Sequence, residues 1–292
     1  MISNREIPKA DFHDLETLWI QISGTLCNLS CTHCFISCAP DNHALPMMQT
    51  EKVLGYLREA EELGVKEIYF TGGEPFLHKN FLEILEVTLQ NFPTSILTNG
   101  LLINENRADK LTRIAQNSHY SLEIRVSLDD YEETRNDSVR GLGTYRKVLS
   151  AYKRLWERGL LPILAVTEIR EYYSPDDSPL DAFEKYVELL GSLGVLRPRI
   201  KIIPIFEMGM LPTPDSPTYI TPQMMTGFDH SLLQCSTSRI ATEDGVYSCP
   251  ILVNEERALI GDSTLSGSLA SCDLYHTACT TCYATGMTCK NY

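Results

Sequence analysis

The segment CNLSCTHCF, residues 27–35, places Cys27, Cys31 and Cys34 at a C-x3-C-x2-C spacing that is followed by an aromatic residue. It comes directly after TLWIQIS, residues 17–23, whose apolar run predicts a buried strand. Thiols at such short spacing are typical metal ligands. A structural zinc site takes four ligands, whereas a [4Fe–4S] cluster held by three cysteines leaves one iron open to a substrate or cofactor.

The residues that follow alternate between strand and helix patterns. Strand patterns occupy residues 17–23, 66–71, 94–100, 120–130, 161–169 and 199–205, and helix patterns occupy residues 50–64, 80–91, 104–117, 144–159 and 179–194. Such alternation requires parallel strands joined by right-handed crossovers. Six units are too few for a closed eight-stranded barrel, so we expect an α/β fold, either a partial (β/α)6 TIM-like barrel or a doubly wound sheet. In both folds the chemistry belongs at the C-terminal ends of the strands.

The alternation stops after residue 205, and the next segment carries four prolines that exclude a continuous helix or central strand: Pro212, Pro214, Pro217 and Pro222. We therefore expect four segments, an N-terminal lead at 1–16, an α/β core at 17–205, a connector at 206–225 and a small cysteine-rich extension at 226–292. Only about sixteen residues precede the first strand, so no separate peptide-recognition domain is expected there.

Composition limits the partners and the compartment. The formal net charge is −13, with 25 basic and 38 acidic residues, and such a surface repels phosphate backbones, so we expect no nucleic-acid partner. No apolar run approaches the length of a membrane span, and the polar N-terminus does not resemble a signal peptide. We expect a cytoplasmic protein without a membrane partner, in which clustered thiols bind metal rather than form disulfides.

The extension holds six of the ten cysteines, and its size predicts that metal ligation supplies part of its stability. The turn EDG, residues 243–245, predicts a hairpin that brings Cys235 and Cys249 together. Cys279 and Cys282 form a C-x-x-C pair, which is typical of metal sites, and Cys272 and Cys289 flank that pair.

With GGEP, residues 72–75, after the second strand, the cysteine loop resembles the signature of radical S-adenosylmethionine (SAM) enzymes. TNG at 98–100, VSLDD at 126–130 and VRG at 139–141 resemble further SAM-contacting positions of that family. The resemblance covers roughly residues 17–205.

The resemblance implies that Cys27, Cys31 and Cys34 ligate three irons of a [4Fe–4S] cluster, and that SAM binds the fourth iron. The residues that it places around SAM are Phe35 near the adenine, Gly72, Gly73 and Glu74 near the amino group, Asn99 near the ribose, Ser127 near the ribose or the carboxylate, and Arg140 at the carboxylate. Ser127 can also be read as a plain strand-end residue, and Arg140 as a surface cation near Asp137.

Four further residues receive mainly structural interpretations. His33 is expected to be a polar loop residue, and the pair Asp129–Asp130 is expected to be a solvated strand end, although Asp129 is also considered for the site. Cys38 is interpreted as a buried spectator rather than as a hydrogen-atom donor.

The extension resembles the SPASM and Twitch segments that hold auxiliary [4Fe–4S] clusters, in a shortened form that implies one such cluster. Cys249, Cys279 and Cys282 are the expected ligands, Cys235 is favoured over Cys289 for the fourth place, and Cys272 is expected to be spare. Four thiolates suit zinc equally well, so a zinc site stays open.

The resemblance implies reductive cleavage of SAM to a 5′-deoxyadenosyl radical that abstracts hydrogen from a substrate. The preferred substrate is a peptide, which would be oxidised, epimerised or crosslinked. Two alternatives stay open, which are radical oxidation or rearrangement of a small molecule such as a sugar or amino acid, and a non-catalytic Fe–S or zinc module. An external one-electron donor such as flavodoxin or ferredoxin is implied.

Overall fold

The computed structural model describes residues 6–168, 179–212, 215–261 and 263–286. One nine-stranded sheet, in the order β10-β9-β8-β2-β3-β4-β5-β6-β7, runs through these residues. Its strands are β2 (Thr17–Gln21), β3 (Glu67–Thr71), β4 (Thr94–Thr98), β5 (Leu122–Ser127), β6 (Ile163–Glu168), β7 (Arg199–Pro204), β8 (Ser238–Ala241), β9 (Val246–Tyr247) and β10 (Leu259–Gly261). A separate two-stranded sheet pairs β1 (Lys9–Ala10) with β11 (Cys272–Asp273).

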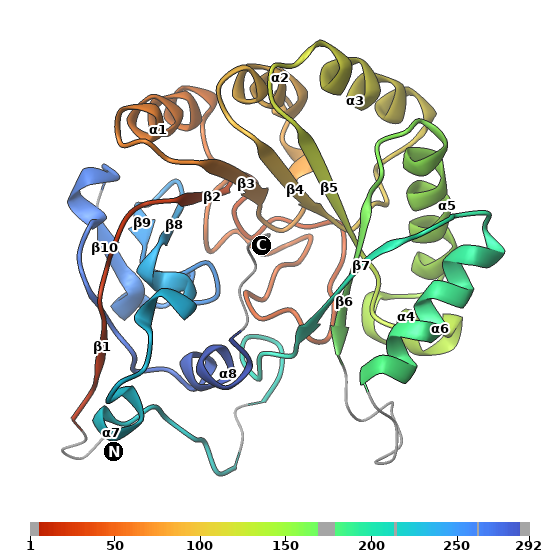
Figure 1. Cartoon of the computed structure of the whole chain (residues 1–292). Coiled ribbons are helices and arrows are strands. Elements are labelled where there is room, and N and C mark those ends of the chain that lie inside the picture. Colours follow the sequence, from red (N-terminus) through yellow and green to blue (C-terminus); the bar gives the residue numbers. More distant parts are fainter. Residues whose placement is uncertain (1–5, 169–178, 213–214, 262, 287–292) are drawn as a thin grey trace.

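The strands β2 to β7 are the six that the sequence predicts, and each is parallel to its neighbour. The helices between them are α1 (Thr50–Glu62), α2 (Phe81–Asn91), α3 (Glu105–Asn117), α4 (Glu133–Arg140), α5 (Thr144–Glu157) and α6 (Pro179–Ser192). In Figure 1, helices α1, α2, α3 and α5 lie along the outer side of the curved sheet, and the loop after β2 lies on its inner side. The sheet is not closed, and the predicted α/β fold, a partial TIM-like barrel, is confirmed.

Among the features that the sequence does not predict, two position the site. The helix α4 has the sequence ETRNDSVR, which lacks a regular apolar face, and it is fixed instead by three inward side chains, Asn136, Val139 and Arg140. The strand β8 pairs in parallel with β2, so the cysteine-rich extension continues the main sheet. The predicted hairpin is present, because β8 and β9 pair antiparallel around residues 242–245. The division of the chain near residue 225 stays a prediction.

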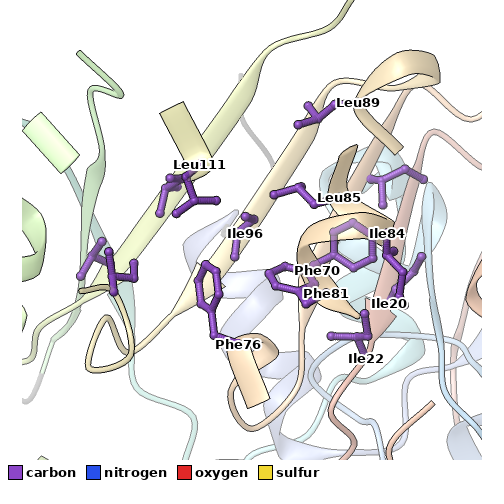
Figure 2. Close-up of a cluster of buried hydrophobic side chains, with 14 of the residues drawn as sticks. Ile20, Ile22, Phe70, Phe76, Phe81, Ile84, Leu85, Leu89, Ile96 and Leu111 are labelled. Carbon is purple, nitrogen blue, oxygen red and sulfur yellow. The ribbon is translucent and has the colours of Figure 1, made fainter. Parts of the chain in front are cut away.

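The core lies between the sheet and its outer helices (Figure 2). Every third or fourth residue of α2 is buried, as expected for an amphipathic helix on a sheet: Phe81, Ile84, Leu85, Thr88 and Leu89. The Phe81 ring meets Phe70 and Phe76 edge-on, with ring centroids 5.4 Å and 5.1 Å apart. This packing fixes the C-terminal end of β3 and the turn that follows it.

We expect the substitution Phe81→Ala to lower the free energy of unfolding by about 3–5 kcal/mol, because it leaves a cavity among three aromatic rings. Val87→Ala, on the exposed side of the same helix, is the matched control and should cost less than about 1 kcal/mol. Urea unfolding of the two variants measures the difference, and equal losses would contradict this packing.

Candidate functional site

The cysteine loop is joined to the glycine turn at the C-terminal end of β3. Gly73 N donates to Gly24 O at 2.9 Å, and Glu74 N donates to Leu26 O at 3.1 Å. A Cβ at residue 73 would lie 2.0 Å from Leu26 O and 2.8 Å from the Cys27 Cβ. Gly72 has φ +147°, and a Cβ there would lie 2.2 Å from Ser23 Oγ. Both positions therefore require glycine, because the turn lies directly against the loop.

The three thiols of the loop differ in their surroundings. Cys27 is buried, and burial raises its pKa to about 12. Burial also raises the pKa of Cys31, an effect that the nearby Arg140 guanidinium opposes. A hydrogen bond with the Cys38 side chain lowers the pKa of Cys34. In such buried surroundings a thiolate needs a positively charged partner. Three thiols beside the glycine turn therefore fit a metal cluster.

Cys38 is buried, and its backbone N donates to Cys34 Sγ at 3.2 Å. It also packs in an apolar cluster with Ile36 and Leu45. Its interpretation as a spectator stays a prediction.

Glu74 is fully buried, and its carboxylate binds the end of β4. It accepts hydrogen bonds from Thr98 Oγ1 at 2.8 Å and from the backbone N of Asn99 at 2.9 Å, and from Phe76 N at 3.1 Å. Burial nevertheless raises the pKa of Glu74 to about 7. The Glu74 side chain thus ties together the ends of two strands, and its contact with an amino group stays a prediction.

Asn99 points back to the cysteine loop. Its Nδ2 donates to Asn28 Oδ1 at 2.7 Å and lies 3.7 Å from Cys27 Sγ. Ser127 is half-buried at the last position of β5. Their predicted contacts with a ribose are untested.

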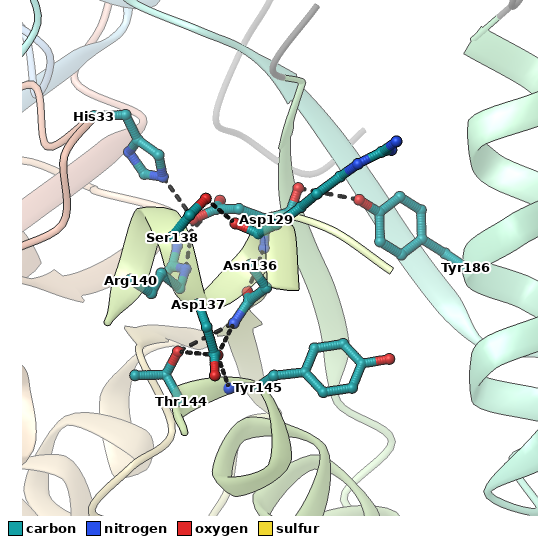
Figure 3. A network of polar contacts seen from close by, with 10 residues as sticks. His33, Asp129, Asn136, Asp137, Ser138, Arg140, Thr144, Tyr145 and Tyr186 are labelled. Carbon is teal, nitrogen blue, oxygen red and sulfur yellow. Dashed lines mark hydrogen bonds and ion pairs between the residues drawn. The ribbon is translucent and has the colours of Figure 1, made fainter. Parts of the chain in front are cut away.

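A buried ion-pair network joins the cysteine loop to the end of β5 (Figure 3). Arg140 Nε lies 2.6 Å from Asp129 Oδ2, and its Nη2 donates to Asp129 Oδ1 at 3.2 Å. His33 Nε2 lies 2.6 Å from the same Oδ2. Burial would raise the pKa of Asp129, but Arg140 and His33 outweigh it and hold that pKa below its ordinary value. The backbone joins the same parts, because Thr32 N donates to Val139 O at 3.0 Å.

This network corrects two interpretations of the sequence. Asp129 and Asp130 are buried, so the pair is not a solvated strand end. Arg140 is 7% exposed and pairs with Asp129, so it is not a surface cation near Asp137. His33 stays a polar residue of the cysteine loop, and it contacts the carboxylate that holds Arg140. The histidine between two of the cysteines was a usable signal, but its partner 96 residues away was not readable.

The connector covers the cysteine loop from the other side. Met210 N donates to Cys34 O at 3.0 Å, and the Phe206 ring centroid lies 6.0 Å from that of Phe35. Gly209 has φ +68°, and a Cβ there would lie 2.4 Å from both Cys34 O and Phe35 O. The backbone of Phe35 is therefore enclosed, and its predicted place near an adenine is untested.

A second group of thiols lines one cavity in the extension: Cys235, Cys249, Cys272, Cys279 and Cys282. Cys279 and Cys282 lie on α8 (Thr277–Thr285), whereas Cys272 lies on β11 and pairs with Ala10 of the N-terminal lead. Cys272 was expected to be spare, yet the structure places it with the other four. The pairing that brings it there joins residues from the two ends of the chain, which the sequence could not indicate. Cys289 lies outside the described residues.

In the described ranges, no three His, Cys, Asp or Glu side chains form a group that could hold a single metal ion. Among the helices that the structure describes, none is both long and apolar enough to cross a membrane.

The chain matches known families over its α/β part. The family model of the radical SAM superfamily matches residues 22–169. A probable GTP 3′,8-cyclase of Methanosarcina acetivorans is 30% identical over 179 residues, which are 59% of this chain and 50% of that protein. The subtilosin biosynthesis protein AlbA of Bacillus subtilis is 29% identical over 143 residues, 48% of this chain and 31% of AlbA. The chain thus spans half or less of these curated relatives.

Solved structures share the fold at lower identity. Streptococcus suis SuiB bound to its precursor peptide SuiA has a TM-score of 0.63 and 15% identity, and the match covers 89% of this chain and 65% of SuiB. This likeness concerns the fold.

We expect Asp129→Asn to lower the free energy of unfolding by about 3–5 kcal/mol, because it leaves the buried Arg140 without its counter-charge. The matched control is Glu133→Gln, which removes the exposed partner of Arg146 and should leave stability unchanged. Thermal and urea unfolding of the metal-free proteins compare the two, and a control as damaging as Asp129→Asn would refute the importance of the buried pair.

The buried Glu74 predicts a pH dependence. Its pKa in the fold, about 7, lies above its ordinary unfolded value, so the protonated carboxyl favours the fold and stability is lost as pH rises through about 7. We expect metal-free wild-type protein to lose roughly 3 kcal/mol more than Glu74→Gln between pH 4.5 and pH 8. Urea unfolding across that range measures it. Asp129 does not interfere, because its lowered pKa affects stability only at more acidic pH. Parallel pH profiles for wild type and variant would count against the raised pKa.

Proposed function

We propose that this chain, an enzyme that belongs to the radical SAM superfamily, binds SAM at a [4Fe–4S] cluster in the cysteine loop and modifies a peptide. The observation that carries this proposal is the contact between the loop and the glycine turn. It presents Cys27, Cys31 and Cys34 beside backbone that approaches without any Cβ, at the C-terminal ends of parallel strands.

The residues present fit these groups. Cys27, Cys31 and Cys34 would hold the cluster, and the backbone of Gly72 and Gly73 would face the SAM amino group. When bound, the reduced cluster and SAM supply a 5′-deoxyadenosyl radical, which removes a hydrogen atom from the substrate. Phe35, Asn99 and Ser127 remain the proposed contacts of the adenosyl part.

Arg140 keeps its proposed role at the SAM carboxylate, with Asp129 and His33 as the residues that hold it. Its pairing with Asp129 fixes the guanidinium beside Cys31, where its charge favours the thiolate form. Asp129 lowers the freedom of that side chain and so reduces the entropy cost of ordering it around a ligand.

Peptide is the substrate class that we favour. The named role of AlbA in bacteriocin biosynthesis supports it, as does the shared fold of SuiB, whose structure contains a precursor peptide. The 30% identity to probable GTP 3′,8-cyclases makes a nucleotide the second candidate. The net charge of −13 counts against a triphosphate, which needs a concentration of cationic side chains.

We further propose one auxiliary [4Fe–4S] cluster in the extension. Five buried or half-buried thiols around one cavity support it. Cys235, Cys249, Cys279 and Cys282 are the proposed ligands, Cys272 is a fifth candidate, and Cys289 stays a prediction. The proposed division of the chain is a radical SAM core at 17–205, a connector at 206–225 and an auxiliary segment at 226–292. An external flavodoxin or ferredoxin would deliver the electron.

The test is anaerobic metal analysis of the variant in which Cys27, Cys31 and Cys34 are all changed to Ala. We expect about four irons per chain to remain, because the auxiliary site has its own thiol ligands. Zinc in place of iron would overturn the auxiliary cluster, and the extension would then be a structural element.

The same triple variant tests catalysis. Reduced wild-type protein should convert SAM to 5′-deoxyadenosine, and the triple variant should lose this activity. Cys38→Ala is the matched control on the same loop and should retain it. Cleavage that GTP accelerates, with a GTP-derived product, would replace the peptide by a nucleotide as substrate.

A further inference from the structure

Arg239, on β8, is a fully buried cation in the extension. Its Nε donates to Ser268 O at 2.8 Å, and its Nη2 donates to Ala270 O at 2.6 Å. Its Nη1 donates to Cys235 O and to Ser238 O, both at 2.7 Å. The acceptors are all backbone carbonyls, and they satisfy the donors of the guanidinium without neutralising its charge.

No carboxylate in the described part of the chain lies within ion-pair distance of Arg239. The face of the Phe12 ring lies 4.1 Å from the guanidinium carbon and offers only a weak cation–π contact. A buried charge without a counter-charge is costly. Burial accordingly lowers the pKa of Arg239, whereas the thiolates of Cys272, Cys235 and Cys249 would raise it. These three cysteines are therefore the candidates for the negative partner of Arg239.

The carbonyls that Arg239 binds belong to the segments that carry those cysteines. One acceptor is Cys235 itself, Ala270 precedes Cys272 by two residues, and Ser248 O, the neighbour of Cys249, lies 3.4 Å from Nη1. The Arg239 side chain thus binds three separate segments of the chain around the cavity that the thiols line. The planar guanidinium is suited to this, because it directs several donors in fixed directions.

We propose that Arg239 is the built-in counter-cation of an anionic metal–thiolate centre in the extension, where it holds three cysteine-bearing segments in place and raises the reduction potential of the centre. The inference rests on the proposed auxiliary cluster. A [4Fe–4S] cluster bound by four thiolates is negatively charged and becomes more so on reduction. A buried cation nearby favours the reduced form, because their attraction is little screened in the protein interior. Arg239 is a positioning residue and touches no substrate.

The charge is tested without removing Arg239. In the Cys27, Cys31 and Cys34 triple-Ala protein, only the auxiliary centre contributes a signal. Phe12 is half-buried and faces the guanidinium, so Phe12→Glu places a carboxylate beside it, and Phe12→Gln is the neutral control of the same shape. We expect a lower midpoint potential for Phe12→Glu than for Phe12→Gln in an EPR-monitored redox titration, with iron content equal. Equal midpoint potentials would overturn the role of the charge.

The positioning role is tested by Arg239→Lys. This substitution keeps the positive charge but loses the planar guanidinium and its several donors in fixed directions. We expect a midpoint potential near that of the parent and a loss of iron per folded chain. Arg125→Lys is the matched control, because Arg125 is a buried arginine on another strand of the same sheet, where it pairs with Glu123 and donates to Tyr69 Oη. Undiminished iron in Arg239→Lys would overturn the positioning role. Zinc rather than iron in the parent would instead refute the auxiliary cluster itself, so the two failures are distinguishable.

Discussion

The backbone contact between the glycine turn and the cysteine loop is the constraint on which the site depends. A Cβ at residue 73 would come within 2.0 Å of Leu26 O, so no other residue allows the two segments to meet. The backbone hydrogen bonds of Gly73 and Glu74 to the cysteine loop then fix the position of Cys27, the first of its three thiols. The buried Glu74 extends this constraint to β4, because its carboxylate accepts hydrogen bonds from Thr98, the last residue of β4, and from Asn99, the first residue after it. The position of the thiols is thus determined by the ends of three neighbouring strands.

The strand β2 links the two groups of cysteines. One of its edges pairs with β3, whose turn supports the cysteine loop, and the other pairs in parallel with β8, which carries Arg239. The N-terminal lead adds a second link, because β1 pairs with β11 beside Cys272. The extension is consequently part of the same sheet as the core that it serves.

The parts of this structure that the sequence predicts are those set by local pattern. Six strands and five helices follow from apolar periodicity, and the glycine turn follows from its place after a strand. The parts that it does not predict depend on contacts between distant residues. The helix α4 has no apolar stripe, and it forms because Asn136 and Arg140 reach Asp129 at the end of β5. His33 gains its partner only when the loop folds over that strand. The sequence does not predict that Cys272 joins the other thiols, because its partner in the sheet is Ala10, near the other end of the chain.

Each group of thiols lies near one buried arginine, and the two arginines differ in a way that bears on electron flow. Arg140 is paired with Asp129, and this carboxylate opposes the effect of the guanidinium on Cys31. Arg239 has only carbonyl acceptors among the described residues, so it adds nearly a full positive charge beside Cys235 and Cys272. On the proposed assignment, this difference contributes an upward shift to the reduction potential of the auxiliary centre, because an unpaired cation favours the more negative, reduced state. A centre at higher potential can accept the electron that remains on a substrate after hydrogen abstraction, which favours an acceptor role over substrate ligation.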